Sequence, residues 1–213
     1  ADAFVSIHVD GVTGAQAATR RGWKVATPFR ASAASEALAA ALSASYPAVT
    51  GLPADPQGPS YDMRAYYAFA HYRYWHSIAP TTPAAIVETA FMTHPADREL
   101  LFDRPDLIAE GIAQGLLAYL RSYDRDDAAA REPVGLPMQR ANAPGVPLRE
   151  RASAESAVQR PLQQDEQLVP VAQAGEWVLL FSQAEGWDLG WVRADQLAPS
   201  GLPMQPPHPC CGE

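Results

Sequence analysis

The chain has 213 residues, a length that fits two modules by the usual domain size of about 100 to 200 residues. Hydrophobic residues make up 47% and charged residues 19%, as in ordinary globular proteins, and 20 prolines indicate several loops and linkers. The net charge of -8 and the scattered arginines argue against nucleic acid as a partner. No apolar run approaches the roughly 20 residues of a membrane helix, so we predict no membrane span.

The first part of the chain alternates predicted strands and helices. Residues 3–9 form an apolar, β-branched run that predicts a strand covered on both faces. Residues 23–27 predict a short second strand, and residues 32–46 predict a helix that begins at a serine. The prolines and glycines of residues 47–60 indicate a loop, and the aromatic segment 61–78 indicates a helix or a helix and a turn.

A third strand and a long helix complete this domain. Residues 84–88 predict an apolar strand that ends on a carboxylate, Glu88. Residues 105–123 place apolar side chains near one helical stripe, with Pro105 in the first turn, where its missing N–H is tolerated. Strands that alternate with helices indicate an α/β layered domain, which we predict to span residues 1–123.

A change in composition separates this domain from a second module. Residues 124–143 are charged and then contain Pro and Gly, as linkers do. Between residues 144 and 199, short apolar stretches recur about every ten residues between turn residues, which indicates a small all-β barrel or sandwich. The sequence Gly-Leu-Pro-Met-Gln of residues 135–139 recurs at 201–205, so we predict that 200–213 is a disordered tail or the start of a further linker.

Two polar residues on predicted strands are candidates for catalysis. A buried strand that delivers Glu88 to a sheet end is one way in which a protein presents a general base. His8 could ligate a metal, since zinc sites use imidazole and carboxylate ligands. Each has a simpler interpretation, with His8 as a hydrogen-bonded structural residue and Glu88 as a capping or ion-pairing carboxylate. Asp10 could orient His8 or start the turn at Gly11, and we favour the turn.

The sequences Ser6-Ile7-His8 and Val87-Glu88-Thr89-Ala90-Phe91 together resemble the motifs of zinc-dependent N-acetylmuramoyl-L-alanine amidases. The resemblance covers the second half of that catalytic domain and implies a partial three-layer α/β/α fold. It implies that His8 is a zinc ligand and that Glu88 is the general acid and base when water attacks an amide. The substrate would be peptidoglycan, cleaved between N-acetylmuramic acid and the L-alanine of the stem peptide.

The chain departs from the family pattern at several positions. Asp10 stands where Asn is common, and Thr93-His94 stands where Ser-Asn is common, with the residue at His94 expected to cap the following turn. The family's first zinc-binding His and its ligand Glu would precede residue 1. We therefore expect a site that is incomplete and inactive by itself, and a half sheet whose exposed edge and apolar faces favour poor solubility or association.

The second module carries a separate resemblance. Gly175-Glu176-Trp177-Val178 and the segment from Gly186 to Arg193 resemble bacterial Src-homology-3-like domains, which are appended to cell-wall enzymes. The resemblance implies that residues 144–199 form a small barrel, closed by the strand Gly190-Trp191-Val192. It also implies a groove for wall peptide or glycan, lined by the aromatic residues Trp177, Trp187 and Trp191.

Together these resemblances favour the C-terminal part of a secreted peptidoglycan amidase, located in the periplasm or at the cell wall, with zinc as cofactor. The alternative is a non-catalytic cell-wall-binding protein with a degenerate or truncated amidase-like domain. A different zinc amidohydrolase of similar fold would explain the motifs, but it accounts less naturally for the appended barrel.

Overall fold

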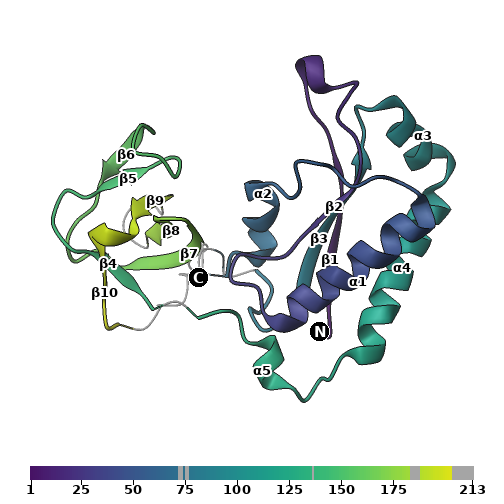
Figure 1. The fold of residues 1–213 in the computed structure, drawn as a ribbon. Helices are drawn as coiled ribbons and strands as arrows, with labels where there is room; N and C mark the ends of the chain where they lie inside the picture. The colour runs from purple at the N-terminus through teal and green to yellow at the C-terminus, as the bar shows by residue number, and fades with distance from the viewer. Residues whose placement is uncertain (72–73, 75–76, 136, 183–187, 203–213) are drawn as a thin grey trace, which may run out of the picture. The chain divides into compact units, whose positions relative to one another are not determined.

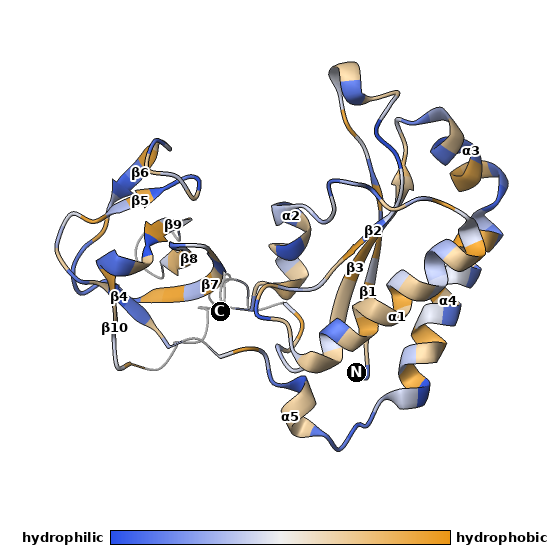
Figure 2. Ribbon diagram, viewed as in Figure 1, coloured by the Kyte–Doolittle hydropathy of each residue, from blue (hydrophilic) through white to orange (hydrophobic). Residues whose placement is uncertain are grey.

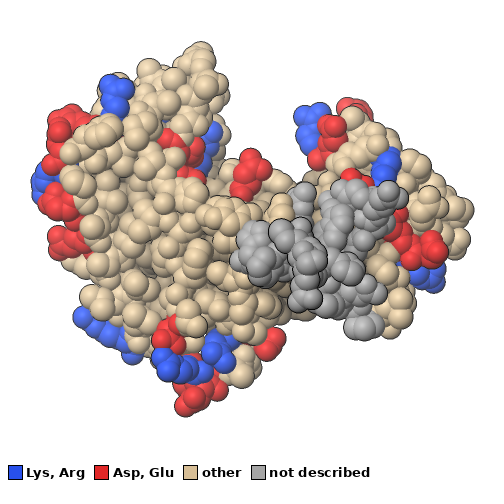
Figure 3. All heavy atoms as spheres, turned by 180° about the vertical axis from the view of Figure 1, so that it is seen from behind, with Lys and Arg blue, Asp and Glu red and all other residues tan. Residues whose placement is uncertain are grey.

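The computed structural model describes residues 1–71, 74, 77–135, 137–182 and 188–202 (Figure 1). The chain divides into two compact units, which we describe separately. Unit 1 consists of Ala1–Phe69 and Ile78–Pro133, and unit 2 of Ala70–Ser77 and Val134–Glu213. None of the helices in the described ranges is long and apolar enough to cross a membrane. On the face drawn in Figure 3, basic and acidic side chains lie in small mixed groups.

Unit 1 has the mixed α/β character that the sequence predicts. Two 3₁₀ turns lie at Gly14–Gln16 and Tyr67–Phe69. Its other elements, in chain order, are β1 (Phe4–Asp10), β2 (Lys24–Ala26), α1 (Ala33–Thr50), α2 (Tyr61–Arg64), β3 (Ala84–Phe91), α3 (Pro95–Asp103), α4 (Pro105–Ser122) and α5 (Ala128–Arg131).

The sheet of unit 1 has the strand order β1-β3-β2. β3 is the central strand, because β1 pairs with one of its edges in parallel and β2 pairs with the other in antiparallel orientation. Its sequence is almost continuously apolar, as expected of a strand that is covered on both faces. Figure 2 shows this apolar character along β3.

Each face of the sheet packs against helical segments, so unit 1 has three layers. On one face, Ala85 and Val87 contact a core formed with α1 and α4. On the other face, Ala84 and Ile86 pack against Met63 of α2 and the following 3₁₀ turn. The side chain at position 88 follows Ala84 and Ile86 along the strand, so Glu88 faces the α2 side.

The structure corrects two predicted boundaries. The loop predicted to begin at residue 47 begins later, because α1 continues through Pro47 to Thr50 and ends at Gly51 in the left-handed region. Pro47 lacks one backbone donor, but its carbonyl accepts a hydrogen bond from Gly51 N at 2.9 Å, which completes the last turn. The strand predicted to end at Glu88 continues to Phe91, and the helix α3 follows it unpredicted.

β1 lies at the edge of the described sheet and exposes apolar side chains there. Ile7 is 59% exposed and Val9 is 42% exposed, on the face opposite His8. The sheet edge thus carries exposed apolar residues as expected, whereas the prediction that the strand of residues 3–9 is covered on both faces is wrong, because Ile7 and Val9 stay uncovered. Poor solubility or association of the chain stays a prediction.

α1 and α4 approach each other closely at a glycine. A Cβ atom added to Gly115 of α4 would lie 2.8 Å from Leu42 Cα and 3.2 Å from the carbonyl oxygen of Ala41, both in the backbone of α1. These backbone atoms cannot move aside without displacing the whole helix α1, unlike the end of a flexible side chain. The absence of a side chain at position 115 therefore sets the separation of these two helices.

We expect Gly115→Ala to destabilise unit 1. Alanine favours a helix by about 1 kcal/mol over glycine, but forcing the two helices apart should lower the free energy of unfolding by about 1–3 kcal/mol net. Urea denaturation measures the difference. Gly135→Ala is the matched control, because a Cβ there meets nothing within 4 Å. Equal stability of the two variants would contradict this account of the packing.

Unit 2 is built from short strands and one 3₁₀ turn at Ala194–Gln196. The strands are β4 (Gln139–Ala141), β5 (Pro147–Arg149), β6 (Val158–Pro161), β7 (Leu168–Ala174), β8 (Trp177–Ser182), β9 (Leu189–Arg193) and β10 (Leu197–Pro199). They form one antiparallel sheet in the order β10-β4-β7-β8-β9-β5-β6. Leu148, Leu168, Leu180 and Val192 lie at its core.

The short apolar stretches of the second module form the strands β5 to β9, whereas β4 and β10 were not predicted. Both are three residues long and pair with each other, so neither shows a period that sequence alone reveals. Within the described residues the sheet has two ends, β10 and β6, and no closed barrel is seen. The second copy of the repeated five-residue sequence lies mostly outside the described residues.

A buried carboxylate joins the strands of unit 2. Glu166 is 6% exposed and accepts hydrogen bonds from Arg160 and Ser182, with a further one from Gln163 N at 3.0 Å. Burial alone would raise the pKa of Glu166, but the hydrogen bonds from Arg160 and Ser182 outweigh burial and lower it. Arg160 also pairs with Asp188 of the segment before β9.

We expect Glu166→Gln to destabilise unit 2 by about 1–3 kcal/mol at neutral pH, since it leaves Arg160 without its buried partner. The folded-state pKa is lowered, so the stabilisation is fully present above the unfolded pKa of about 4.3 and is lost as the pH falls through the folded value. Thermal unfolding at pH 7 and at pH values below about 4 should therefore show a difference that shrinks with acid. A difference independent of pH, or an equal loss in the exposed control Glu150→Gln, would contradict it.

Candidate active site

Three polar residues lie side by side across the sheet of unit 1. Glu88 of β3 has His8 as its register partner on β1 and Lys24 as its register partner on β2. Side chains at register positions point to the same face of a sheet. The sheet therefore brings together His8 and Glu88, which are eighty positions apart in sequence, and adds Lys24 to them.

This row opens into a pocket of about 420 Å³ on the α2 side of the sheet. The walls come from β1, β2, β3 and the segment that leads into α2. The charged and aromatic side chains that line it include His8, Asp10, Arg20, Lys24, Asp62, Tyr66 and Glu88. The pocket is thus polar at its base and bounded by an aromatic ring, as small-molecule and peptide sites are.

Glu88 sits at the base of the pocket with one oxygen unpartnered. Its Oε2 is buried and accepts no hydrogen bond from any described residue. Burial raises the pKa of Glu88 to about 7, Asp10 acts in the same direction, and Lys24 acts against it. A carboxyl group with a pKa near neutrality can both accept and return a proton, which is what a general acid and base must do.

His8 is held on the pocket face by contacts within the fold. Its Nε2 lies 3.0 Å from Ser6 Oγ, and its ring packs edge-on against Tyr66, with 5.1 Å between the ring centroids. The backbone beside it is fixed by Thr89 Oγ1, which donates to the carbonyl oxygen of His8 at 2.9 Å. Tyr46 of α1 in turn donates to the carbonyl oxygen of Thr89 at 2.8 Å.

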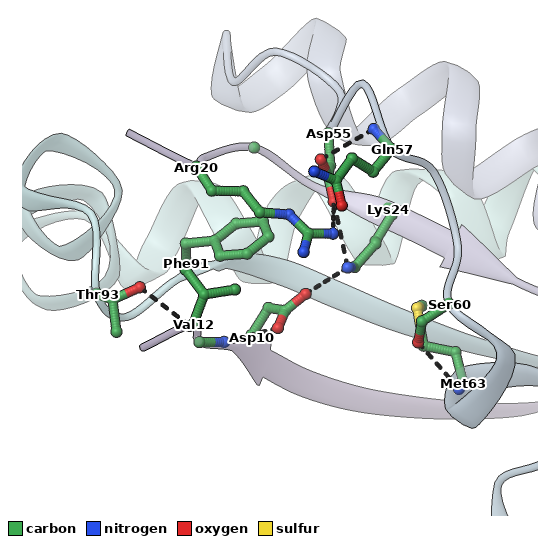
Figure 4. A network of polar contacts seen from close by, with 12 residues as sticks. Asp10, Val12, Arg20, Lys24, Asp55, Gln57, Ser60, Met63, Phe91 and Thr93 are labelled. Carbon is green, nitrogen blue, oxygen red and sulfur yellow. Dashed lines mark hydrogen bonds and ion pairs between the residues drawn. The ribbon is translucent and has the colours of Figure 1, made fainter. Parts of the chain in front are cut away.

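Asp10 starts the turn after β1, as the sequence favours, and it also forms an ion pair. Its Oδ1 accepts a hydrogen bond from Gly11 N at 2.7 Å, and its Oδ2 pairs with Lys24 Nζ. Lys24 also pairs with Asp55 at 3.2 Å, and Arg20 pairs with the same oxygen of Asp55 at 2.8 Å (Figure 4). Asp10, Lys24 and Arg20 of this network line the pocket, whereas Asp55 does not.

His94 lies outside the row and has a structural position. It occupies the N-cap position of α3, before Pro95, but its side chain makes no capping hydrogen bond there, and its Nδ1 is 3.6 Å from Asp97 Oδ1. Asp97 is fully buried and accepts hydrogen bonds from Gly22 N at 2.7 Å and from Phe91 N at 3.2 Å. These contacts tie the end of β3 to the segment before β2.

The described residues fit part of a zinc site. They contain no group of three or more His, Cys, Asp or Glu side chains placed to hold a metal ion. His8 can supply one imidazole ligand, and the unpartnered oxygen of Glu88 suits a base that is not itself a ligand. Among the described residues, His8 is therefore suited to be one zinc ligand and Glu88 to be the base.

Sequence reasoning missed Lys24. It sits in a strand of only three residues, and nothing in its local pattern marks it as part of a site. One signal was present, since Lys24 is the only lysine in the 213 residues. The tryptophans proposed for wall binding are in unit 2, where Trp177 is buried and Trp191 is partly exposed. Trp187 lies outside the described residues.

Comparison with known proteins identifies the family. Residues 1–118, more than half of the chain, match the family model described as N-acetylmuramoyl-L-alanine amidase. The chain belongs to the N-acetylmuramoyl-L-alanine amidase family. No curated protein is similar enough to the chain to count as a match.

Solved structures of such amidases are also similar to this chain. An N-acetylmuramoyl-L-alanine amidase from Clostridium difficile 630 shares 25% sequence identity with a TM-score of 0.45, over 58% of this chain and 60% of that one. An amidase of the same name from Nostoc punctiforme shares 25% identity with a TM-score of 0.42, over 57% of this chain and 59% of that one. The chain thus spans about three fifths of the length of these solved structures.

Proposed function

We propose that this chain is part of a peptidoglycan hydrolase that cleaves the amide bond between N-acetylmuramic acid and the L-alanine of the stem peptide. Membership of the amidase family supports the reaction type. The observation that carries the proposal in this chain is the buried, unpartnered oxygen of Glu88 at the base of a pocket, beside His8.

Glu88 would act as general base and then as general acid. It would take a proton from the attacking water and return it to the nitrogen of the leaving L-alanine, so that the amide bond breaks and an amine is released. Its pKa of about 7 suits both directions of transfer near neutral pH. The surrounding walls of the pocket would hold the substrate amide within reach of this carboxylate.

His8 would be one of the ligands that hold zinc, as the family resemblance implies. When bound, zinc supplies a Lewis acid that polarises the amide carbonyl and lowers the pKa of water. Ser6 and Tyr66 fix the His8 ring, so this ligand is oriented before the metal arrives.

Unit 2 would keep the enzyme on its substrate. We propose that it is a Src-homology-3-like module that binds peptidoglycan, and that a groove including Trp191 makes the contact. Trp177 is 8% exposed, so most of its ring packs within the unit and little of it would reach a ligand. Tethering raises the effective concentration of enzyme at an insoluble wall without changing the chemistry of the site. The protein would act outside the cell membrane, in the periplasm or at the wall.

In the complete protein, we expect Glu88→Gln to lower hydrolysis of a muropeptide by about 10²–10⁴-fold, because an amide cannot accept the proton. Zinc content, measured by elemental analysis, should be unchanged, since Glu88 is not proposed as a ligand. Glu99→Gln on the exposed surface of α3 is the matched control. Activity of Glu88→Gln close to that of the control would remove Glu88 from the role of base.

Two further results of the same experiment bear on the proposal. A parent protein that hydrolyses muropeptides but contains no zinc would contradict the metal part alone. A parent protein without zinc and without activity that still binds peptidoglycan would favour a non-catalytic wall-binding protein instead.

Deleting residues 144–213 from the complete protein should weaken its retention on purified walls, while turnover of a soluble muropeptide stays largely unchanged. The reason is that tethering acts only on the insoluble substrate. Wall pull-down and a soluble assay measure the two effects separately. Trp191→Ala tests the groove within the intact module. Equal wall retention of the parent and the deleted protein would contradict the anchoring role.

A further inference from the structure

Lys24 stands out in this chain because it is the only lysine among the cationic residues, all the others being arginines. Its side chain is 5% exposed, although lysine is among the residues least often buried. It lies in the three-residue strand β2, beside the proposed base. A buried ammonium needs compensating charge, and the structure supplies two carboxylates for it.

Those carboxylates come from different parts of unit 1. Asp10 ends β1, and Asp55 belongs to the loop after α1. Figure 4 shows the Lys24 ammonium between them, with dashed lines to both. The distance to Asp55 Oδ2 is 3.2 Å, and the ammonium also lies 5.2 Å from the ring centroid of Phe91. We call this arrangement the lysine clamp.

The lysine clamp determines whether Glu88 forms an ion pair with Lys24. Glu88 and Lys24 are register partners on neighbouring strands, a placement in which opposite charges normally pair. Here Lys24 pairs with Asp10 and Asp55, while Glu88 Oε2 accepts no hydrogen bond from the described residues. A carboxylate held in an ion pair is a poor base, because its lone pairs are already engaged.

The choice of lysine over arginine fits this arrangement. An ammonium is compact and can direct its three donors to separate partners, whereas a guanidinium is a planar fork with five donors. In the row His8–Glu88–Lys24, a larger fork at position 24 would extend its donors toward Glu88 as well as toward the clamp. Arg20 satisfies Asp55 from the other side at 2.8 Å, where such bulk is accommodated.

We propose that Asp10 and Asp55 hold the Lys24 ammonium away from Glu88, and that Asp55 is thereby a positioning residue that keeps the base free of an ion pair. This rests on the proposed role of Glu88. Asp55 is the informative partner, because it does not line the pocket that contains His8 and Glu88. Any effect of Asp55 on hydrolysis must therefore pass through Lys24, through its other partner Arg20, or through the fold.

Asp55→Asn removes the charge and preserves the shape of this side chain. The donors that it releases should turn to Glu88, and hydrolysis by the complete protein should fall by about tenfold or more, because the base is then engaged. Adding Lys24→Met should recover at least roughly threefold of that loss, since the competing ammonium is gone. A merely structural Asp55 predicts the opposite, because the double variant would lose still more of the network.

Arg20→Met is the matched control for the same carboxylate. It removes an ion pair from Asp55 but leaves the lysine clamp intact, so adding Lys24→Met to it should not raise activity. The crystal structure of Asp55→Asn in the present chain provides a readout that does not depend on activity. We expect Lys24 Nζ within about 4 Å of a Glu88 carboxylate oxygen.

A second pair of variants keeps the test decisive if Asp55→Asn does not fold. Lys24→Arg keeps the charge and Lys24→Met removes it, so a purely structural ion pair predicts that Lys24→Arg is the more active and the more stable of the two. The clamp predicts that the two variants rank oppositely in stability and in activity. Lys24→Arg should be the more stable in thermal unfolding, and Lys24→Met should be the more active.

Two outcomes would overturn the inference. One is that Asp55→Asn/Lys24→Met is no more active than Asp55→Asn, and the other is that the more stable of the two Lys24 variants is also the more active. Failure of the proposed function gives a different result, since Glu88→Gln would then retain activity. In that case the crystal structure of Asp55→Asn still reports whether the clamp holds Lys24 away from Glu88.

Discussion

The whole of unit 1 depends on β3 being covered on every side. Its two edges pair with β1 and β2, and its two faces pack against α1 with α4 and against the α2 segment. Ala85, Val87, Ala90 and Phe91 are completely buried, so the helices approach the strand closely. A single charged residue, Glu88, interrupts this apolar strand, and its position is therefore fixed by all three layers at once.

Burial gives Glu88 its chemical character, and the neighbouring charges preserve it. The sheet that buries the Glu88 carboxylate also places Lys24 beside it. An ion pair between the two would lower the pKa that burial has raised. Asp10 and Asp55 occupy that lysine instead. The fold thus joins the cations Lys24 and Arg20 to two acids in ion pairs. Beside them, Glu88 has one oxygen without a hydrogen-bond partner among the described residues. Such an arrangement is unfavourable for stability alone and is typical of a functional site.

Unit 2 follows a different physical logic. Its strands are short and its apolar core is small, and buried Glu166, in the turn before β7, links β6 and β8 through Arg160 and Ser182. Here hydrogen bonds from Arg160 and Ser182 outweigh burial and lower the pKa of Glu166, whereas burial and the neighbouring Asp10 raise the pKa of Glu88 in unit 1. The same residue type therefore has a lowered pKa in one unit and a raised pKa in the other, because burial and hydrogen bonding are balanced differently.

The sequence determined the elements whose patterns are long and regular. The apolar runs of β1 and β3 and the stripe of α4 marked their elements without tertiary information, and the motifs around His8 and Glu88 pointed to the amidase family before any geometry was known. The three-residue strands β4 and β10 carry no period, and only the tertiary structure revealed them, whereas β2 was expected within residues 23–27 and the structure supplied its partner. The lysine clamp was decided in the same way, because the pairing of β1, β3 and β2 brings Asp10 and Lys24 together, and the backbone contacts of the loop after α1 with Trp23 add Asp55.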